Sequence, residues 1–400
     1  MKKSRVLLIG QYFYPEKISS GVLPYELAVE LANNGYDVSA LVGFPKEYID
    51  INNQCKKKEC VNGIKIKRMS YIQAKRKNVI GRIVNILSFT VSVFFHPMCF
   101  KKTDVCISFT NPPLLPFIVS IYCRLFKKKH MVVLYDLYPD VAVKLGMFGE
   151  KSVLSKVFDK VNLFVYKYCD RIIAISNEMK AYLVNYKGVD EAKIVVIHNW
   201  YQNLYEANNY SISIPIKVMY GGNMGKAQDM QTILDIVLSM KNDERFEFLF
   251  IGHGSDKEEI KESIEKNKLV NCKMFDFLPK EEYDKMLETA HIAMLSIKDE
   301  ILGLGSPSKY YGYLALKKPI IAVVPNDSDI ANDIEIKKNG IHIMSGDIVK
   351  AKKFLTEIAE DESRLIEMSK KSFELFKEKY TVEISANKFI EEIDYIINKK

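Results

Sequence analysis

The 400-residue sequence has no apolar run that is long enough to cross a bilayer as a helix. The two most apolar segments, 83–95 and 114–126, fall short of the roughly 20 residues that such a helix needs. Asn85 interrupts the first segment and Pro116 the second. At the N-terminus, MKKS is followed by RVLLIG, which is too short for the apolar part of a secretory signal. We therefore expect no membrane-spanning helix and no signal peptide.

Cysteine is sparse and follows no ligand pattern. The closest of the seven cysteines, Cys55 and Cys60, have no second pair at a matching spacing, so no zinc site is predicted. Cys106 and Cys123 lie in apolar runs, which is typical of buried thiols. The simple expectation is a reducing, cytoplasmic environment.

Patterns typical of metal and nucleic-acid binding are missing too. No carboxylate pair of the DxD type follows a predicted strand in a suitable loop, so the sequence fits a function without a metal ion. Basic residues do not alternate with aromatic residues along one face, which argues against nucleic-acid binding. The chain also has no low-complexity segment and no internal repeat.

The composition is that of a folded protein of two domains. Hydrophobic residues make up 48% of the chain and charged residues 27%, and this length fits two domains of about 150–200 residues. The net charge is +8, with lysine clusters at 56–58, 101–102 and 127–129. These clusters are either ordinary solvated surface or a region that attracts anionic lipid headgroups or a phosphorylated acceptor.

Strand and helix patterns alternate in both halves of the chain, which is typical of a doubly wound parallel sheet. In the first half we expect Gly35 to close the first helix in a left-handed conformation. The predicted strands there are 6–9, 37–42, 104–109, 131–135, 171–176 and 193–197, and the predicted helices are 22–33, 114–126, 153–168 and 179–186.

The stretch 199–214 has neither periodicity and is predicted to be a linker. After it we expect strands at 216–220, 246–251, 272–275, 292–296 and 319–324, and helices at 229–240, 256–265, 280–289, 308–316 and within 361–400. The prediction is an α/β protein with two Rossmann-like domains, 1–200 and 201–380, that face each other across a cleft. A C-terminal helix, 381–400, is expected to pack back on the first domain.

Ligands of open parallel sheets bind at the carboxyl ends of the strands, where four loops stand out. Glycines let the backbone approach a phosphate in Gly221–Lys226, in the Gly252-His253-Gly254 turn and in Gly303–Lys309. In the last of these, Ser306 is predicted as a helix N-cap and Pro307 as the first helical residue, so that the helix start attracts an anion. The fourth loop, 15–21, follows the first strand. Each loop is open to a purely structural interpretation.

Seven motifs occur in a fixed order along nearly the whole chain: QYFYPE (11–16), YDLYPD (135–140), AISNEMKAYL (174–183), KIVVIHNW (193–200), YGGNMGKAQDM (220–230), FIGHGS (250–255) and SPSKYYGYLALKKPIIA (306–322). This set resembles the bacterial family-4 glycosyltransferases of the GT-B fold, especially the branch that builds O-antigen, capsule and exopolysaccharide. The ordered set is specific, although no single motif is.

The resemblance implies a donor site for a nucleotide-diphosphate sugar, with UDP as the favoured nucleotide. It gives Lys226 the role of contacting the diphosphate and places the backbone of Gly21 against the donor phosphates. It also gives catalytic roles to Asp136, Tyr135 and Lys226. The donor-binding residues that we predict are Gly21, Gly222, Asn223, Gly225, Lys226, Gly252, His253, Gly254, Ser306, Pro307, Ser308, Lys309 and Tyr311.

The sequence departs from the family pattern at four positions. Asn223 replaces an arginine, and Tyr135 replaces a histidine that in many relatives meets the sugar or the acceptor. Leu304 and Gly312 stand where the family carries a pair of glutamates, the second of which usually binds the ribose. The resemblance then leaves ribose recognition to Tyr310, Tyr311 or a backbone group.

The family also implies a retaining transfer without a metal or other cofactor. The expected donor sugar is an N-acetylated or deoxyamino hexose. The expected acceptor is a saccharide linked to a polyprenyl diphosphate. Helices within 75–129, with Phe89, Phe94 and Phe95, are expected either to lie in an anionic membrane interface or to form the core of the first domain. The expected location is the cytoplasm, at the inner face of the plasma membrane.

Two other functions remain open from the sequence alone. One is a UDP-sugar 2-epimerase, which shares the two-domain architecture but needs acid and base side chains that are sparse here. The other is a non-catalytic partner subunit of an active transferase, an alternative that the missing carboxylate at position 312 favours.

Overall fold

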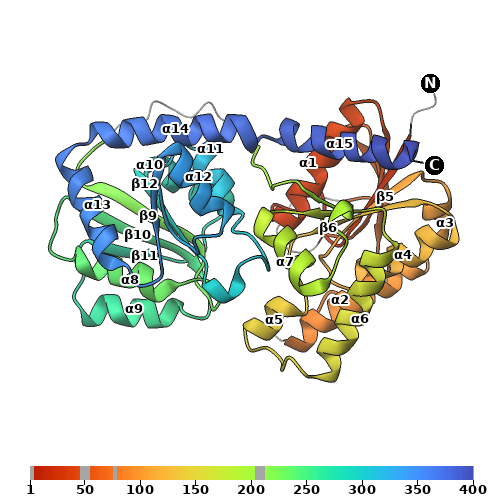
Figure 1. Ribbon diagram of the computed structural model, residues 1–400, viewed down its shortest axis with the longest axis horizontal. Coiled ribbons are helices and arrows are strands. Elements are labelled where there is room, and N and C mark those ends of the chain that lie inside the picture. Colours follow the sequence, from red (N-terminus) through yellow and green to blue (C-terminus); the bar gives the residue numbers. More distant parts are fainter. Residues whose placement is uncertain (1–3, 46–54, 75–78, 203–211, 400) are drawn as a thin grey trace. The chain divides into compact units, whose positions relative to one another are not determined.

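The computed structural model describes residues 4–45, 55–74, 79–202 and 212–399. The chain divides into two compact units (Figure 1). Unit 1 comprises Met1–Asn199, Leu304–Ser306 and Val382–Lys400, and unit 2 comprises Trp200–Gly303 and Pro307–Thr381. Each unit contains one sheet with helices on both faces, so the α/β class is confirmed.

Unit 1 is built on an eight-stranded sheet in the order β3-β4-β2-β1-β5-β6-β7-β8. All neighbouring strands are parallel except β3, which pairs with β4 antiparallel. The strands are β1 (Arg5–Gly10), β2 (Asp37–Gly43), β3 (Lys58–Val61), β4 (Ile64–Met69), β5 (Val105–Phe109), β6 (Lys129–Leu134), β7 (Arg171–Ala174) and β8 (Ile194–Val196).

The helices of unit 1 cover this sheet, and the last helix of the chain packs on the first. The Tyr36 hydroxyl, just after α1, donates to Asp394 of α15 over 2.6 Å. The helices are α1 (Ser19–Asn33), α2 (Val79–Phe94), α3 (Pro97–Lys101), α4 (Leu115–Leu125), α5 (Asp140–Lys144), α6 (Val153–Tyr168), α7 (Asn177–Lys187) and α15 (Val382–Asn398), with a 3₁₀ turn at Glu191–Lys193.

Unit 2 has a fully parallel six-stranded sheet in the order β11-β10-β9-β12-β13-β14. The strands are β9 (Ile216–Asn223), β10 (Phe246–His253), β11 (Cys272–Phe275), β12 (Ile292–Ser296), β13 (Ile320–Val323) and β14 (Gly340–Ile343). The helices are α8 (Met230–Ser239), α9 (Lys257–Lys266), α10 (Lys280–Thr289), α11 (Lys309–Ala315), α12 (Asp329–Lys337), α13 (Ile348–Glu360) and α14 (Ser363–Lys379), with a 3₁₀ turn at Asp299–Ile301.

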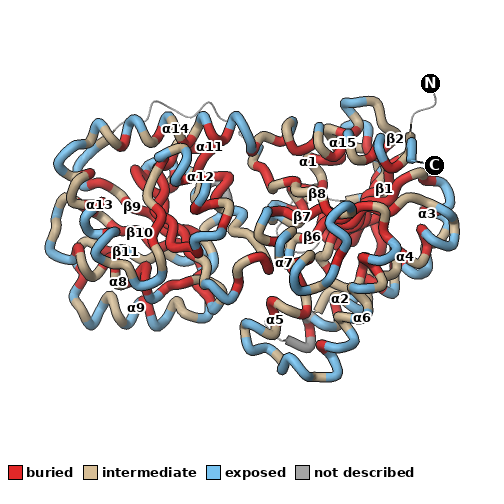
Figure 2. Tube along the Cα trace, in the orientation of Figure 1, coloured by how far each residue is buried: buried red, intermediate tan, exposed pale blue. Residues whose placement is uncertain are grey.

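The central strands are buried on both faces, as expected for parallel sheets covered by helices (Figure 2). In unit 2, Phe248 and Phe250 of β10 fill one side of the sheet, while Leu249 and Ile251 of the same strand fill the other. In unit 1, Leu7 and Ile9 pack with α2 and α4 through Phe89 and Val119. These two-sided cores hold the strand ends, and therefore the loops after them, in place.

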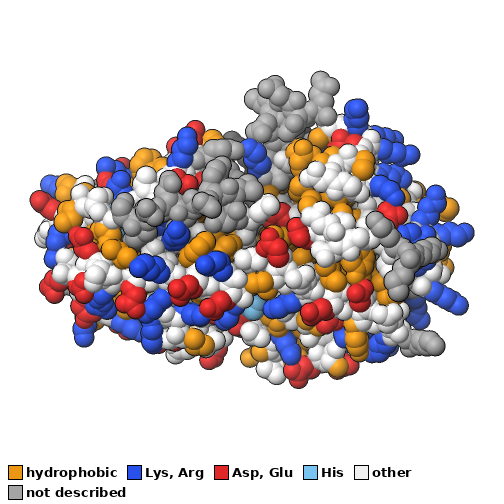
Figure 3. All heavy atoms as spheres, turned by 90° about the horizontal axis from the view of Figure 1, so that it is seen from above, with side chains coloured by type: hydrophobic (Ala, Val, Ile, Leu, Met, Phe, Trp, Pro, Cys, Tyr) orange, Lys and Arg blue, Asp and Glu red, His pale blue; other side chains and the backbone are white. Residues whose placement is uncertain are grey.

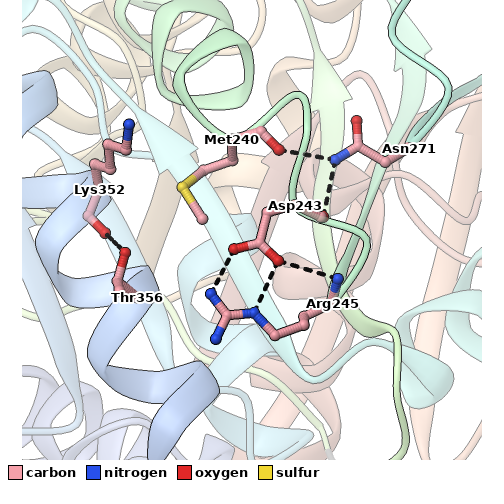
Figure 4. A network of polar contacts seen from close by, with 6 residues as sticks. All are labelled: Met240, Asp243, Arg245, Asn271, Lys352 and Thr356. Atoms are coloured by element: carbon pink, nitrogen blue, oxygen red, sulfur yellow. Dashed lines mark hydrogen bonds and ion pairs between the residues drawn. The ribbon is translucent and has the colours of Figure 1, made fainter.

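A polar network at the amino end of β10 is structural (Figure 4). Arg245 and Asp243 form an ion pair at 2.6 Å, and the Asn271 amide donates to the Met240 carbonyl over 3.0 Å. These contacts fix the turn between α8 and β10 at the end of the sheet opposite the glycine loops. The network therefore supports the strand without lining a ligand site.

The sequence-based element boundaries are mostly confirmed, with specific errors. Gly35 has a φ of +90° and closes α1, as predicted. The first helix begins at Ser19, three residues early, so Gly21 lies inside it. The β3–β4 hairpin was missed because its outward side chains are charged. Helix α12, strand β14 and helix α13 were missed too. Of the predicted linker, 203–211 lie outside the described residues.

Candidate functional site

The two glycine loops of unit 2 lie side by side and require glycine. The pairing of β9 with β10 includes Gly222 opposite Gly252 and ends at Asn223 opposite His253. Gly252 and Gly254 have φ values of +144° and +153°. A Cβ on Gly252 would lie 2.0 Å from the Gly222 carbonyl oxygen, and one on Gly254 would lie 1.9 Å from the Met224 carbonyl oxygen. Because no side chain fits there, the two backbones can form one continuous surface.

Backbone and amide hydrogen bonds hold the first of these loops. Met224 N–H donates to the His253 carbonyl over 2.7 Å. The Gln228 side-chain oxygen accepts from Gly225 N–H over 3.2 Å and from the Asn223 amide over 3.1 Å. Lys226 follows and is exposed. Asn223 thus serves the loop itself, and Lys226 is the side chain of this loop that is placed to meet an anion.

Lys309 lies against the same loop with its charge buried. Its Nζ atom is 3.9 Å from the centre of the Tyr220 ring, a cation–π contact. A Cβ placed on Gly222 would lie 3.7 Å from this Nζ. The Nζ is inaccessible to solvent and has no hydrogen-bond partner among the residues that the structure describes. A buried ammonium without an acceptor is unusual, because burying a charge is expensive unless it is paired.

Burial lowers the pKa of Lys309 to about 7. Between this value and the ordinary 10.5, the unfolded chain binds more protons at this position than the folded chain does. The contribution of Lys309 to folding stability therefore rises with pH across that window. An anion at Nζ would reverse this effect by favouring the charged form.

Tyrosine side chains pack against the backbone of the Gly221–Lys226 loop. The Tyr220 hydroxyl donates to the Asn223 carbonyl over 3.0 Å. The Tyr313 hydroxyl accepts from Gly221 N–H and donates to the Gly221 carbonyl, both over 3.2 Å. A Cβ on Gly221 would lie 2.3 Å from the Tyr283 hydroxyl. The sequence interpretation missed these tyrosines, although Tyr220 directly precedes the glycines.

The predicted helix start at 306–308 is wrong in detail. Helix α11 begins at Lys309, its N-cap position is Ser308, and no side chain caps it. Ser306 is therefore not the N-cap, and Pro307 precedes the helix. The predicted capping fails because Pro307 already accepts a turn hydrogen bond from Tyr310 N–H over 3.0 Å. Leu304–Ser306 form part of unit 1, where the Leu304 carbonyl accepts from Leu137 N–H over 2.9 Å.

The other predicted donor residues lie in different surroundings. His253 is exposed, and its ring meets Phe277 edge-on with the centroids 5.6 Å apart. Tyr311 is buried, and its ring packs on that of Tyr380 at 5.0 Å. The core position of Tyr311 argues against contact with a ligand, and its role in the donor site stays a prediction.

In unit 1, Tyr135 and Asp136 follow β6. Both backbone N–H groups point to the Thr110 hydroxyl, at 3.0 and 3.5 Å. The Tyr135 ring stacks on Phe109 with the centroids 5.7 Å apart. Asp136 is exposed, and a Cβ on Gly305, in the same unit, would lie 2.9 Å from its Oδ1. Asp136 thus presents a carboxylate at the carboxyl end of a strand, and its catalytic role remains a prediction.

The loop after β1 is held in place by contacts with α1 and with the end of β4. Gly21 is buried in the first turn of α1, and a Cβ there would lie 3.1 Å from the Glu16 carbonyl oxygen. The buried guanidinium of Arg68 at the end of β4 pairs with Glu59 and donates to the Tyr14 carbonyl over 2.8 Å. Gly21 therefore lies in a helix and not in a loop, and its backbone role at a phosphate remains a prediction.

The carboxylate of Asp140, at the start of α5, is engaged in contacts that hold neighbouring helices together. It accepts from the Tyr182 hydroxyl over 2.8 Å and forms an ion pair with Lys187, also at 2.8 Å. Lys187 in turn pairs with Asp159 of α6. Among the described residues, no group of three or more His, Cys, Asp or Glu side chains is arranged to hold a metal ion.

Comparison with known families agrees with this arrangement. The family model "Glycosyltransferase Family 4" matches residues 21–201, and "Glycosyl transferases group 1" matches residues 212–374. The chain belongs to glycosyltransferase family 4. It is 27% identical over 270 residues to the "Probable glycosyltransferase WbjE" of Pseudomonas aeruginosa, an alignment that spans 65% of this chain and 67% of that protein. The chain is therefore a glycosyltransferase.

Solved structures show the same fold. Sucrose-phosphate synthase from Thermosynechococcus elongatus has a TM-score of 0.72 at 13% identity, covering 100% of both chains. Anabaena HepE in complex with UDP and glucose has a TM-score of 0.70 at 11% identity, covering 98% of this chain and 100% of that chain. At such low identities the likeness shows the GT-B architecture.

The close backbone approach at Gly254 makes a first prediction. We expect Gly254→Ala to lower the free energy of unfolding by at least about 1–3 kcal/mol, because alanine disfavours this φ and its Cβ overlaps Met224. Gly149→Ala is the control, since a Cβ there meets nothing within 4 Å. Chemical denaturation of the full chain measures both, and equal stability of the two variants would contradict the account.

Proposed function

We propose that this glycosyltransferase uses a UDP-sugar as donor and that the Gly221–Lys226 loop, with Lys309, binds its diphosphate. The observation that carries the proposal is the buried Lys309 ammonium, which has no acceptor among the described residues and lies next to Gly222. A diphosphate oxygen at this place completes the missing interaction.

Two features of unit 2 and one solved structure of the same fold support a diphosphate in preference to a neutral ligand. The carboxyl ends of β9 and β10 place both glycine loops at the edge where parallel sheets bind ligands. Lys226 supplies an exposed cation in the same loop as Gly222. Anabaena HepE, which shares this fold, was solved in complex with UDP-glucose.

In the proposed reaction, the bond between the sugar anomeric carbon and the diphosphate oxygen breaks as the acceptor hydroxyl oxygen attacks from the same face. The acceptor proton moves to the leaving phosphate oxygen, so the sugar keeps its anomeric configuration and no protein base is needed. Lys226 and Lys309 stabilise the charge that develops on the diphosphate, a role that requires no metal ion. Asp136 and Tyr135 would meet the acceptor. The donor sugar is proposed to be an N-acetylated or deoxyamino hexose.

A panel of nucleotide sugars tests the proposed donor. We expect UDP-sugars to raise the thermal midpoint of the protein more than GDP- or dTDP-sugars do, because a ligand that binds only the folded state stabilises it. Lys226→Ala should abolish transfer from the UDP-sugar that binds. No shift with any nucleotide sugar would overturn the donor assignment, and near-normal turnover of Lys226→Ala would overturn the role of that lysine.

The low pKa of Lys309 predicts a pH-dependent affinity for the donor. The affinity of UDP-glucose should fall about tenfold between pH 6 and pH 8, because a group with a pKa of about 7 loses its proton there and the diphosphate binds the charged form. Titration calorimetry at several pH values measures this. Lys309→Met should bind more weakly and show a flat profile, while Lys266→Met, an exposed control on α9, should match the parent chain. The same slope in Lys309→Met would contradict the assignment.

We further propose that the acceptor is a saccharide on a polyprenyl diphosphate, reached from the cytoplasmic membrane surface in the synthesis of a cell-surface polysaccharide such as O-antigen. None of the described helices is both long and apolar enough to span a bilayer, so contact would be peripheral. Helix α2 supports this contact with exposed apolar side chains at Ile83, Leu87, Val91 and Phe94. Their spacing of three and four residues places them on one helical face.

Other features of unit 1 add to this surface. Phe95 and Met98 continue the exposed apolar stretch, and Lys101 and Lys102 follow it. Lys and Arg side chains gather at one end of unit 1 (Figure 3). Phe89, by contrast, is fully buried and packs with Leu7 and Ile9 of the sheet, which is the second of the two alternatives for this side chain. Of the segment 75–129, residues 75–78 lie outside the described residues.

Vesicle flotation tests the membrane surface. The chain should float with vesicles that contain anionic lipid, because the apolar face of α2 and the adjacent lysines both favour such a surface. Leu87→Asp combined with Val91→Asp should reduce the bound fraction at least about tenfold. At each position a charge replaces apolar area that the bilayer would bury on binding. Val270→Asp, at an exposed apolar residue of unit 2, is the control. Unchanged flotation of the double variant would remove α2 from the contact.

A further inference from the structure

The aromatic ring of Tyr201 covers a glycine of α11 one helical turn from Lys309. A Cβ on Gly312 would lie 3.3 Å from Tyr201 Cε2 and 3.4 Å from Cδ2. These distances are tight for a real side chain, so the glycine lets the ring lie against the helix backbone. Because residues three apart on a helix are neighbours, the ring lies on the helix side from which Lys309 projects.

Two further contacts fix the place of Tyr201. Its backbone N–H donates to the Tyr380 carbonyl over 3.2 Å. The Tyr380 hydroxyl binds the Asp333 carboxylate, which also accepts from Tyr310 of α11 over 3.1 Å. The position of Tyr201 relative to α11 is therefore set by the ring on Gly312 and by this buried network.

The phenol end of the Tyr201 ring also lies at α11, because its Cζ atom would be 3.8 Å from a Cβ on Gly312. It lies close enough to Tyr283 to add to the raised pKa of that residue, whose main cause is burial. The Tyr283 hydroxyl in turn lies against Gly221, the residue before Gly222. Tyr201 is only partly buried. A hydroxyl and an aromatic surface thus adjoin the proposed phosphate site on the side of α11.

In a nucleoside diphosphate, the group joined directly to the phosphates is a sugar with vicinal hydroxyls. We propose that Tyr201 is a specificity-determining residue of the donor site and that its hydroxyl forms a hydrogen bond with the ribose hydroxyls of the nucleotide. This inference rests on the proposed diphosphate site at Lys309 and Gly222. It also accounts for glycine at position 312, since a larger side chain would displace the ring.

A cycle of ligands and variants tests this role. The affinities of UDP, 2′-deoxy-UDP and 3′-deoxy-UDP are measured by titration calorimetry for the parent chain, Tyr201→Phe and the control Tyr186→Phe, an exposed tyrosine of α7. We expect the parent and the control to prefer UDP over at least one deoxy analogue by about five- to tenfold, the value of one hydrogen bond. Tyr201→Phe should bind UDP and that analogue equally, with UDP weakened to the level of the analogue.

A second variant guards against a purely structural effect. Gly312→Ala should reduce the same discrimination by shifting the ring, while its thermal midpoint holds or rises, because alanine favours a helix more than glycine does. Unchanged discrimination in Tyr201→Phe, or none in the parent chain, would overturn the role of Tyr201 and leave the diphosphate site standing. If the parent chain binds none of the three ligands, both proposals fail.

Discussion

The contact between the Lys309 ammonium and the Tyr220 ring is the interaction on which the donor end of unit 2 depends. An ammonium held 3.9 Å from a ring centre, without an acceptor in the described chain, has exchanged its hydration for a weaker partner. Such a placement destabilises the charged form and so lowers the pKa of Lys309 to about 7. The fold tolerates it because the sheet is packed on both faces and α11 forms part of one of these cores, so the helix that carries the lysine cannot move without disturbing a core.

The surrounding residues follow from the same constraint. The Tyr220 ring faces the lysine, and its hydroxyl is tied to the Asn223 carbonyl, so ring and loop move together. Tyr313 binds both backbone groups of Gly221. The glycines at 222, 252 and 254 let two loops pack backbone to backbone, which leaves the loop surface free of side chains beside the charge. A rigid surface of this kind can bind an anion without reorganising, which is the condition for strong electrostatic stabilisation in catalysis.

Much of this could be predicted from the sequence, and the exceptions have physical causes. The alternation of apolar strands with amphipathic helices predicted both sheets, since buried parallel strands read as continuous apolar runs. The glycine loops and Lys309 could be found from spacing after strands. The charge state of Lys309 could not, because it depends on burial among residues that are distant in the chain, such as Tyr220, which is 89 positions away. The predicted cap at Ser306 failed because Pro307 begins a turn that precedes the helix.

The tyrosines of α11 show the same limit of prediction from sequence. Sequence reasoning placed ribose recognition at Tyr310, Tyr311 or a backbone group, and both tyrosines are core residues packed against Tyr380. Helix periodicity alone does not say which face of a seven-residue helix is open when every neighbour is apolar. Likewise Phe89 and Phe94 look alike in the sequence, yet one is buried and the other exposed, because five residues turn a helix by more than a right angle.

The most direct measurement is the titration of Lys309 itself, by NMR of ¹³Cε-labelled lysine, with the signal assigned through Lys309→Arg. The account predicts a pKa near 7 in the free protein and a pKa raised by at least about two units when UDP-glucose is bound, because the diphosphate favours the ammonium. An ordinary lysine pKa in the free protein, or a low pKa that UDP-glucose leaves unchanged, would contradict the claim that this buried charge binds the donor.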